Sequence, residues 1–246
     1  MEPSGNTILV TGGTSGIGMA LAERFLSLGN EVIVCGRRAE ALDAMKKKHP
    51  RIHTRICDIG SAKDRVALSH WITAEFPKLN VLVNNAGIQR KHDFKSLEDW
   101  SDTISEIDIN INGPVHLSAL LIPHLMRQRK SEIINVSSNL AFVPLAPMPV
   151  YCASKAFIHS FTLSLRHQLK DTSVGVSEII PPAVKTNLGG AHDFGADLDS
   201  FADSIIAQLK EGKTEATYGM SERSSQASRD ELDKAFAEMN SGSWTP

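Results

Sequence analysis

One stretch decides the fold: Thr7-Ile8-Leu9-Val10-Thr11-Gly12-Gly13-Thr14-Ser15-Gly16-Ile17-Gly18. Its apolar, β-branched start predicts a short buried strand that ends at the glycines. Helical apolar spacing follows directly, from Met19 to Leu26. A strand, a glycine turn and a helix in this order bring backbone N–H groups and a helix N-terminus against a phosphate. A plain strand–helix connection is the alternative. The predicted nucleotide-binding turn consists of Gly12, Thr14, Ser15, Gly16, Ile17 and Gly18.

Strand and helix patterns alternate along the rest of the chain. The further predicted strands are Glu31–Cys35, Arg51–Cys57, Val81–Val83, Glu132–Val136, Val174–Ile180 and Ala216–Tyr218. Helical patterns separate them, and no repeat or linker interrupts the series. Alternation of this kind predicts an α/β fold. We expect one doubly wound, Rossmann-type domain over residues 1–246, with about seven parallel strands and helices on both faces.

Composition narrows the possible functions. The chain has 246 residues and a formal charge of −2, which argues against a partner such as nucleic acid or an anionic membrane. No apolar run reaches the roughly 18 residues of a membrane span, and residues 1–6 lack a secretory signal pattern. Cys35, Cys57 and Cys152 lack metal-ligand spacing. We expect buried, reduced thiols, no metal site and a cytoplasmic location.

Tyr151 and Lys155 stand four residues apart in a helical pattern, so they should share one helix face. The positive charge of Lys155 should lower the pKa of the Tyr151 phenol from its usual value of about 10 and prepare it for acid–base chemistry. Taken alone, the pair favours the simpler interpretation of a half-buried Tyr and a solvated Lys. Ser138 follows a predicted strand thirteen residues upstream of Tyr151. A further strand ends in Asn84-Asn85-Ala86-Gly87.

These residues together resemble the short-chain dehydrogenase/reductase family. The glycine turn matches its T-G-x-x-x-G-x-G pattern, and residues 84–87 match its N-N-A-G motif. The resemblance implies a reductase in which Tyr151 is the general acid/base, Ser138 positions the carbonyl oxygen, and Lys155 bonds the cofactor ribose and lowers the Tyr151 pKa. It also implies a catalytic Asn: Asn110 has the expected spacing, and Asn112 is the competing assignment. A bacterial subgroup named for teichoic-acid D-alanylation is especially similar, although that name implies no chemistry.

The resemblance also locates the cofactor. Family members that use NAD carry Asp at the position of Gly36, whereas here Arg37 and Arg38 follow, which favours NADP(H) over NAD(H). The alternative is a solvated Arg at a strand end. Asp58 should bond the adenine, with helix capping as its alternative. Proline replaces the glycine of the family's P-G-x-V-x-T motif at Pro182, and proline cannot adopt the φ values that glycine permits. The remaining implied cofactor contacts are Ile59, Asn85, Ala86, Gly87, Pro181, Val184 and Thr186.

Several surface features remain open at this point. The polar loop Gln89–His92 could recognise an acidic substrate, but a solvated loop is favoured. The Gly-rich segment Asn187–Leu198 predicts a mobile lid. Phe157, Phe161 and Leu165 form a stripe that would face a second subunit in a homodimer or homotetramer, or else the chain's own sheet.

The predicted function is interconversion of a carbonyl and an alcohol on a small, partly apolar substrate with NADP(H). A dehydratase or isomerase that uses the same Tyr is one alternative. A nucleotide-sensing regulator is another, because a fold does not determine a function.

Overall fold

The computed structural model describes residues 2–96, 99–190 and 194–242. The strands within these residues are β1 (Thr7–Thr11), β2 (Glu31–Gly36), β3 (His53–Ile56), β4 (Leu79–Asn84), β5 (Ser131–Val136), β6 (Val174–Ile180) and β7 (Glu215–Thr217). They form one seven-stranded sheet in the order β3-β2-β1-β4-β5-β6-β7, and every neighbouring pair is parallel. The predicted doubly wound, Rossmann-type α/β fold is confirmed.

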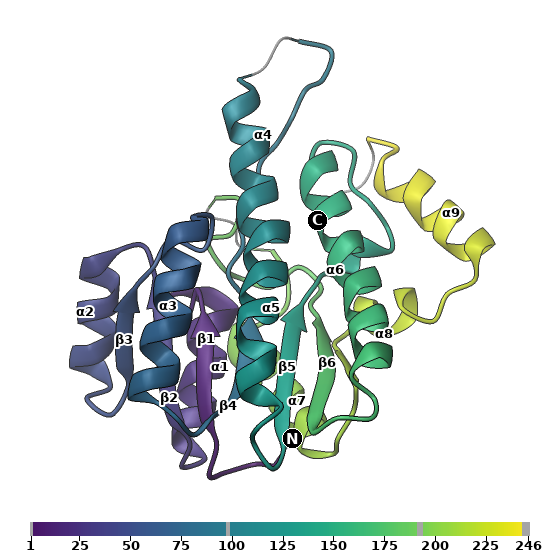
Figure 1. Ribbon diagram of the computed structural model, residues 1–246. Helices are drawn as coiled ribbons and strands as arrows, with labels where there is room; N and C mark the ends of the chain where they lie inside the picture. The colour runs from purple at the N-terminus through teal and green to yellow at the C-terminus, as the bar shows by residue number, and fades with distance from the viewer. Residues whose placement is uncertain (1, 97–98, 191–193, 243–246) are drawn as a thin grey trace.

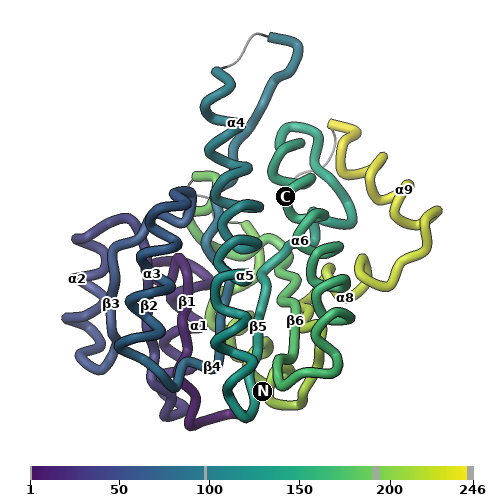
Figure 2. The backbone as a smooth tube through the Cα atoms, in the orientation of Figure 1, coloured from purple at the N-terminus to yellow at the C-terminus, as the bar shows by residue number. Residues whose placement is uncertain are grey.

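Helices cover both faces of the sheet (Figure 1). One face carries α1 (Gly16–Ser27), α2 (Ala39–Lys48) and α7 (Leu198–Lys210), and the other carries α3 (Ala62–Glu75), α5 (Gly113–Leu125) and α6 (Pro149–Gln168). The remaining helical segments are α4 (Trp100–Ile107), the π-helix η1 (Asp108–Asn112), the 3₁₀ turn η2 (Asn139–Ala141), α8 (Met220–Ser224) and α9 (Arg229–Met239). The backbone trace shows α4 extending beyond the ends of the strands, and α9 at the outer edge (Figure 2).

Alternation along the strands divides the core into two layers. In β1, Ile8 and Val10 pack with Phe25 and Phe201 on the α1/α7 face, whereas Leu9 packs with Leu121 on the other face. Because both faces are covered by helices, the three central residues of β1, Ile8 to Val10, are all apolar, and the whole strand is buried. This explains why the strand appears in the sequence as a continuous apolar run rather than as an alternating one.

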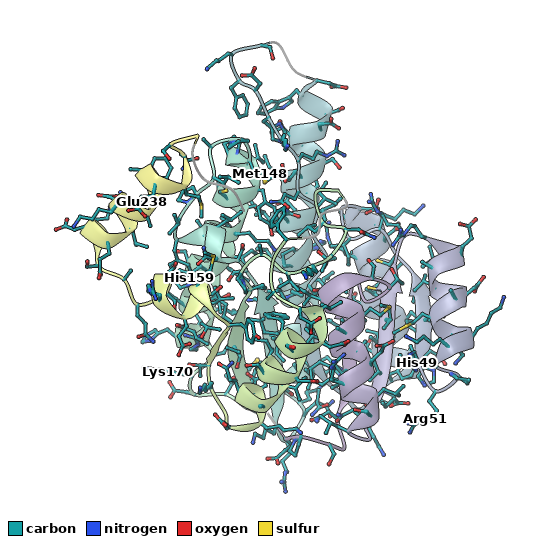
Figure 3. All side chains as sticks on the ribbon, turned by 180° about the vertical axis from the view of Figure 1, so that it is seen from behind. His49, Arg51, Met148, His159, Lys170 and Glu238 are labelled. Carbon is teal, nitrogen blue, oxygen red and sulfur yellow. The ribbon has the colours of Figure 1, made fainter. Side chains whose placement is uncertain are left out.

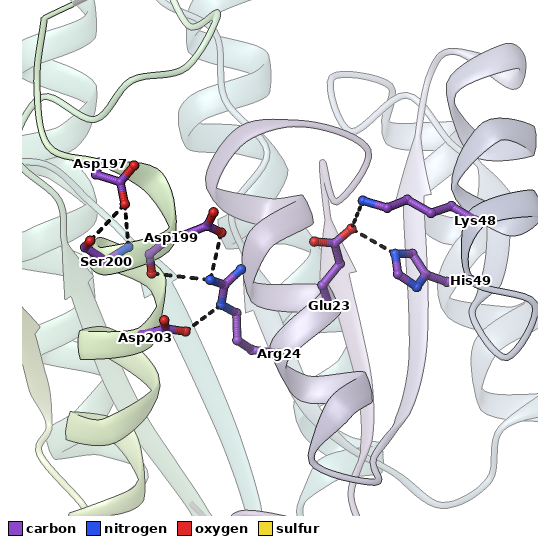
Figure 4. A network of polar contacts seen from close by, with 8 residues as sticks. All are labelled: Glu23, Arg24, Lys48, His49, Asp197, Asp199, Ser200 and Asp203. Atoms are coloured by element: carbon purple, nitrogen blue, oxygen red, sulfur yellow. Dashed lines mark hydrogen bonds and ion pairs between the residues drawn. The ribbon is translucent and has the colours of Figure 1, made fainter.

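Ion pairs attach α1 to its neighbours at the surface of this layer (Figure 4). Arg24 on α1 contacts Asp199 at 2.8 Å and Asp203 at 2.9 Å, both on α7. Glu23 binds Lys48 and His49 at the end of α2. These exposed or half-exposed pairs each contribute little stability in water. They connect α1 with α2 and α7, and the N-terminus of α1 faces the predicted nucleotide site.

The predicted outward stripe on α6 is partly wrong. Leu165 is buried in the core beside α5, and Phe161 packs against the same cluster. Phe157 is 43% exposed and stacks on Phe161. The reason is helical geometry: residues eight positions apart drift round the helix, so the stripe turns from solvent into the sheet.

Two segments next to the site are only partly described. Helix α4 begins at Trp100, and residues 97–98 before it lie outside the described residues. The predicted lid, Asn187–Leu198, includes residues 191–193, which also lie outside them. The described end of that segment is anchored, because Ala196 forms a bridge with Val184. No helix among the described residues is long and apolar enough to cross a membrane.

Candidate active site

The site begins where the sheet order reverses direction. β1 and β4 are neighbours in space, and their chains leave the sheet toward opposite sides, which opens a crevice at their carboxyl ends. The glycine turn follows β1, and Asn84–Gly87 ends and follows β4. The sequence motifs therefore meet at the topological switch point, where ligands of such sheets bind.

The glycine turn has the shape of a phosphate cradle. Gly12 and Gly16 adopt φ of +65° and +53°, which side chains disfavour. A Cβ on Gly12 would lie 2.9 Å from the Ala86 backbone, so only glycine allows this close approach. Ser15 precedes α1, and its side chain makes no capping bond to the first turn. The N–H groups at this helix N-terminus can therefore serve an anionic ligand, and the residues present fit a dinucleotide pyrophosphate.

Asn85 ties the turn to β4. Its amide donates to the carbonyls of Thr11 at 2.9 Å and Gly12 at 3.3 Å. The Thr11 hydroxyl accepts the backbone N–H groups of Asn85 and Ala86 and donates to Val83. A Cβ on Gly18 would lie 2.3 Å from the Asn85 amide nitrogen. The glycine turn and residues 84–87 thus form one interlocked unit, although they lie far apart in the sequence.

The predicted adenosine side lies at the ends of β2 and β3. Arg37 and Arg38 are exposed directly after Gly36, and no acid occupies that position. Asp58 is not the cap of α3, because Ser61 accepts the capping N–H there. Instead, the Asp58 carboxylate accepts the backbone N–H of Gly60 at 2.9 Å. The capping alternative for Asp58 is therefore wrong, and the adenine contacts of Asp58 and the buried Ile59 remain predictions.

The choice between the two asparagines has a structural basis. Asn110 is buried in η1, where its carboxamide accepts the N–H of Ile88 at 2.9 Å and donates to the carbonyl of Ile88 at 2.8 Å. A Cβ on Gly87 would lie 3.3 Å from Asn110 Oδ1 and 3.7 Å from Lys155 Nζ. Asn112 instead pairs with Asp108 at the exposed side. Only Asn110, of the two, lies beside Lys155.

Ser138, Tyr151 and Lys155 converge at the carboxyl end of β5. The Ser138 hydroxyl lies close enough to the Tyr151 phenol to lower its pKa. Lys155 Nζ donates to the carbonyl of Val136 at 2.9 Å and lies 5.5 Å from the centre of the Tyr151 ring. All three residues are buried. The spacing in sequence thus produces the predicted cluster of a hydroxyl, a phenol and an ammonium.

The predicted lowering of the Tyr151 pKa is wrong for the chain without cofactor. Burial raises the pKa of Tyr151 well above 10, although the nearby Ser138 hydroxyl opposes this. Burial also lowers the pKa of Lys155 to about 8, against the attraction of Glu178. For both groups, loss of water is the largest cause of the pKa shift. Tyr151 therefore keeps its proton at neutral pH, which is the form that a proton donor requires.

The loop after β6 brings a further predicted segment to the turn. A Cβ on Gly16 would lie 3.3 Å from the Thr186 methyl group. Pro181 accepts the N–H of Asn139, next to Ser138, and Val184 is buried. All described non-glycine residues have negative φ, so Pro182 is accommodated without a left-handed turn. Residues 181–186 thus connect the phosphate cradle with the Ser138 segment.

Sequence reasoning missed two acid–imidazole pairs near the cluster, each with a buried carboxylate. His92 Nε2 lies 2.9 Å from Glu106 Oε2, and Glu106 also accepts the N–H of Arg90. The favoured interpretation of Gln89–His92 as a solvated loop is therefore wrong at His92. The second pair joins His159 to Glu178 at 2.9 Å. An acid within the apolar run Val174–Ile180 was the available signal for it.

The cysteines match their prediction: Cys35, Cys57 and Cys152 are free and buried. Among the described residues, no group of three or more His, Cys, Asp or Glu side chains could hold a metal ion.

The chain belongs to the short-chain dehydrogenase family, whose sequence model matches residues 6–193. It is 48% identical over 248 aligned residues to the uncharacterized oxidoreductase DltE of Bacillus subtilis, with 98% of each chain covered. It is 35% identical to the NADP-dependent 3-hydroxy acid dehydrogenase YdfG of Salmonella typhi, with 72% of each chain covered. A short-chain dehydrogenase from Burkholderia cenocepacia, solved in complex with NADP, superimposes with a TM-score of 0.84 at 26% identity and covers 96% of this chain and 99% of its own.

Proposed function

We propose that this chain interconverts a carbonyl and an alcohol on a small, partly apolar substrate, with NADP(H) as the cofactor. The observation that carries the proposal is the buried convergence of Ser138, Tyr151, Lys155 and Asn110 beside the glycine cradle. A phenol held as its protonated form next to a second hydroxyl is suited to donate a proton to an oxygen that becomes negative.

Each residue of the cluster has a separate task. Ser138 holds the carbonyl oxygen and Tyr151 donates the proton to it. Lys155 binds the ribose hydroxyls and favours the phenolate after that transfer, and Asn110 holds a water that connects Lys155 to solvent. When bound, the cofactor supplies the hydride. The glycine turn and the N-terminus of α1 hold its pyrophosphate.

Preference for NADP(H) is the second part of the proposal. Arg37 and Arg38 are exposed cations where an adenosine 2′-phosphate would lie, and Gly36 offers no carboxylate to a 2′-hydroxyl. The name of the Salmonella relative and the NADP complex of the Burkholderia structure agree with this assignment. The same relative makes 3-oxo and 3-hydroxy acids the first substrates to examine.

The test is direct measurement of NADPH oxidation. Purified protein is mixed with NADPH and a panel of aldehydes, ketones and 3-oxo acids, and absorbance of the reduced nicotinamide is followed. At least one carbonyl should be reduced to the corresponding alcohol, and NADH should support a slower reaction. Tight NADPH binding without turnover on any carbonyl, together with conversion of an alcohol by dehydration or isomerisation, would contradict the proposal.

A further inference from the structure

The carboxylate of Glu178 is buried beneath the helix that carries Tyr151 and Lys155. Glu178 lies in β6 and is 0% exposed, in a strand whose other residues near it are apolar or small. A carboxylate away from water is strongly disfavoured unless it is paired. In the described structure its side chain accepts a hydrogen bond from His159 Nδ1, with distances of 2.9 and 3.2 Å to its two oxygens.

The geometry of α6 places this pair next to Lys155. Lys155 and His159 are four residues apart, so both lie on the helix face that covers β5 and β6. Lys155 reaches Val136 at the end of β5, and His159 reaches Glu178 on the adjacent β6. His159 itself lies toward the outside of the fold, with its side chain 25% exposed (Figure 3). The carboxylate is thus paired with a partly exposed imidazole and lies under the same face of α6 as the buried ammonium of Lys155.

The other charged side chains near this pair are bonded elsewhere, so Glu178 is the acid whose negative charge attracts Lys155. From α6, Arg166 faces the pair, and from β7 Glu215 does so; these two side chains pair with each other at 3.3 Å. On the far side of the cluster, Glu106 acts on Tyr151 and is itself bonded to His92. Burial lowers the pKa of Lys155 to about 8, and the attraction of Glu178 is the force that opposes this lowering.

We propose that Glu178 is a positioning residue that keeps Lys155 in its ammonium form, and that His159 holds the carboxylate in place. The inference rests on the proposed function, because it is Lys155 as an ammonium that bonds the ribose and assists Tyr151. The charge acts within the low dielectric of the core, where water screens it weakly. Removing this charge should therefore change the protonation of Lys155 in the active site, although Glu178 itself is not proposed to contact substrate or cofactor.

The decisive variant is Glu178→Gln, which removes the charge and keeps an acceptor for His159. Without the carboxylate the ammonium loses support, so Lys155 gives up its proton at lower pH. The dissociation constant of NADPH is measured by its fluorescence between about pH 6 and pH 10 for each protein. The pH at which this dissociation constant rises on the alkaline side should be lower in the variant by about one pH unit or more. The titration of Lys155 in the cofactor-free protein, followed by NMR of ¹³C-labelled lysine, should move in the same direction.

Two variants serve as controls. Glu132→Gln neutralises another buried acid in the adjacent strand β5, where Glu132 bonds to Ser177. It should leave both titrations unchanged. His159→Asn places an uncharged N–H donor near the former Nδ1, so Glu178 stays bonded and the alkaline midpoint should stay near that of the unmodified protein.

A double variant distinguishes damage to the fold from the proposed effect of losing the Glu178 charge. Replacing Glu178 with Met and His159 with Phe removes both polar partners and leaves neither unsatisfied, which proteins tolerate better than loss of one partner. It should show the same downward movement as Glu178→Gln. Unchanged midpoints in Glu178→Gln or the double variant would overturn the inference, and so would an equal movement in Glu132→Gln. Failure of NADPH to bind the unmodified protein would instead contradict the proposed function, while the lysine titration would still test Glu178.

Discussion

Arg37 is the residue expected to distinguish NADPH from NADH, because only NADPH carries a negatively charged 2′-phosphate. Its guanidinium is exposed after Gly36 and can form a charge-assisted bond to a 2′-phosphate, a contact worth about 1.5–3 kcal/mol. We predict that NADPH binds at least about tenfold more tightly than NADH. Arg37→Asp should narrow or reverse this preference, as measured by titrating both cofactors.

The matched control for Arg37 is Arg51→Asp, an exposed arginine just before β3 and outside the predicted cofactor contacts. It makes the same change in net charge and should leave the ratio of affinities unchanged. Equal affinities of the unmodified protein for NADPH and NADH would show that Arg37 does not bind the phosphate.

At the scale of elements, the phosphate cradle depends on contact between two turns. A Cβ on Gly18 would overlap the Asn85 amide, so Gly18→Ala must displace either α1 or the turn after β4. Overpacking of this kind typically costs about 1–3 kcal/mol. We predict a lower melting temperature and at least about a tenfold loss of NADPH affinity, because the N-terminus of α1 moves away from the pyrophosphate.

Gly29→Ala provides the comparison. Gly29 has φ of +84° with open space around it, so alanine there adds backbone strain without a clash. Its melting temperature should fall while NADPH affinity is retained. Loss of affinity in Gly29→Ala equal to that in Gly18→Ala would mean that general destabilisation, and not the interlock, governs binding.

The elements also show what the sequence can and cannot predict. Apolar runs such as Thr7–Val10, followed by glycines, predict their strands because both faces of the sheet are covered. The π-helix at Asn110 was not predicted. The Asn110 side chain bonds to the backbone of Ile88, in a loop that is far away in the sequence. The burial of His92 and Leu165 likewise depends on partners from other segments. Local sequence patterns therefore predict the helices and strands, whereas tertiary contacts decide which individual side chains become buried.

At the scale of the whole molecule, exposed apolar side chains on α4 and α6 suggest assembly. Trp100 and Ile104 on α4 are 61% and 42% exposed, and Phe157 on α6 is 43% exposed. Because α4 and α6 are in contact, these side chains are candidates for one shared surface. We predict a dimer or tetramer at micromolar concentration by light scattering, which Phe157→Glu should dissociate.

Met126→Glu is the control for assembly. Met126 is 47% exposed at the opposite end of α5, away from α4. This variant should keep the mass of the unmodified protein. A monomeric mass for the unmodified protein would sink the assembly prediction, whereas a dimer that survives Phe157→Glu would place the interface elsewhere.

The central claim is that Tyr151 donates the proton, and one comparison tests it most directly. The chain has two tyrosines, so Tyr151→Phe can be compared with Tyr218→Phe, which changes a residue packed against Phe201. Turnover on a confirmed carbonyl substrate and the dissociation constant of NADPH are measured for both. Tyr151→Phe should lose about 10²–10⁴-fold in turnover with little change in NADPH affinity, because the ribose contact belongs to Lys155. Tyr218→Phe should retain both. Near-native turnover in Tyr151→Phe would contradict the account.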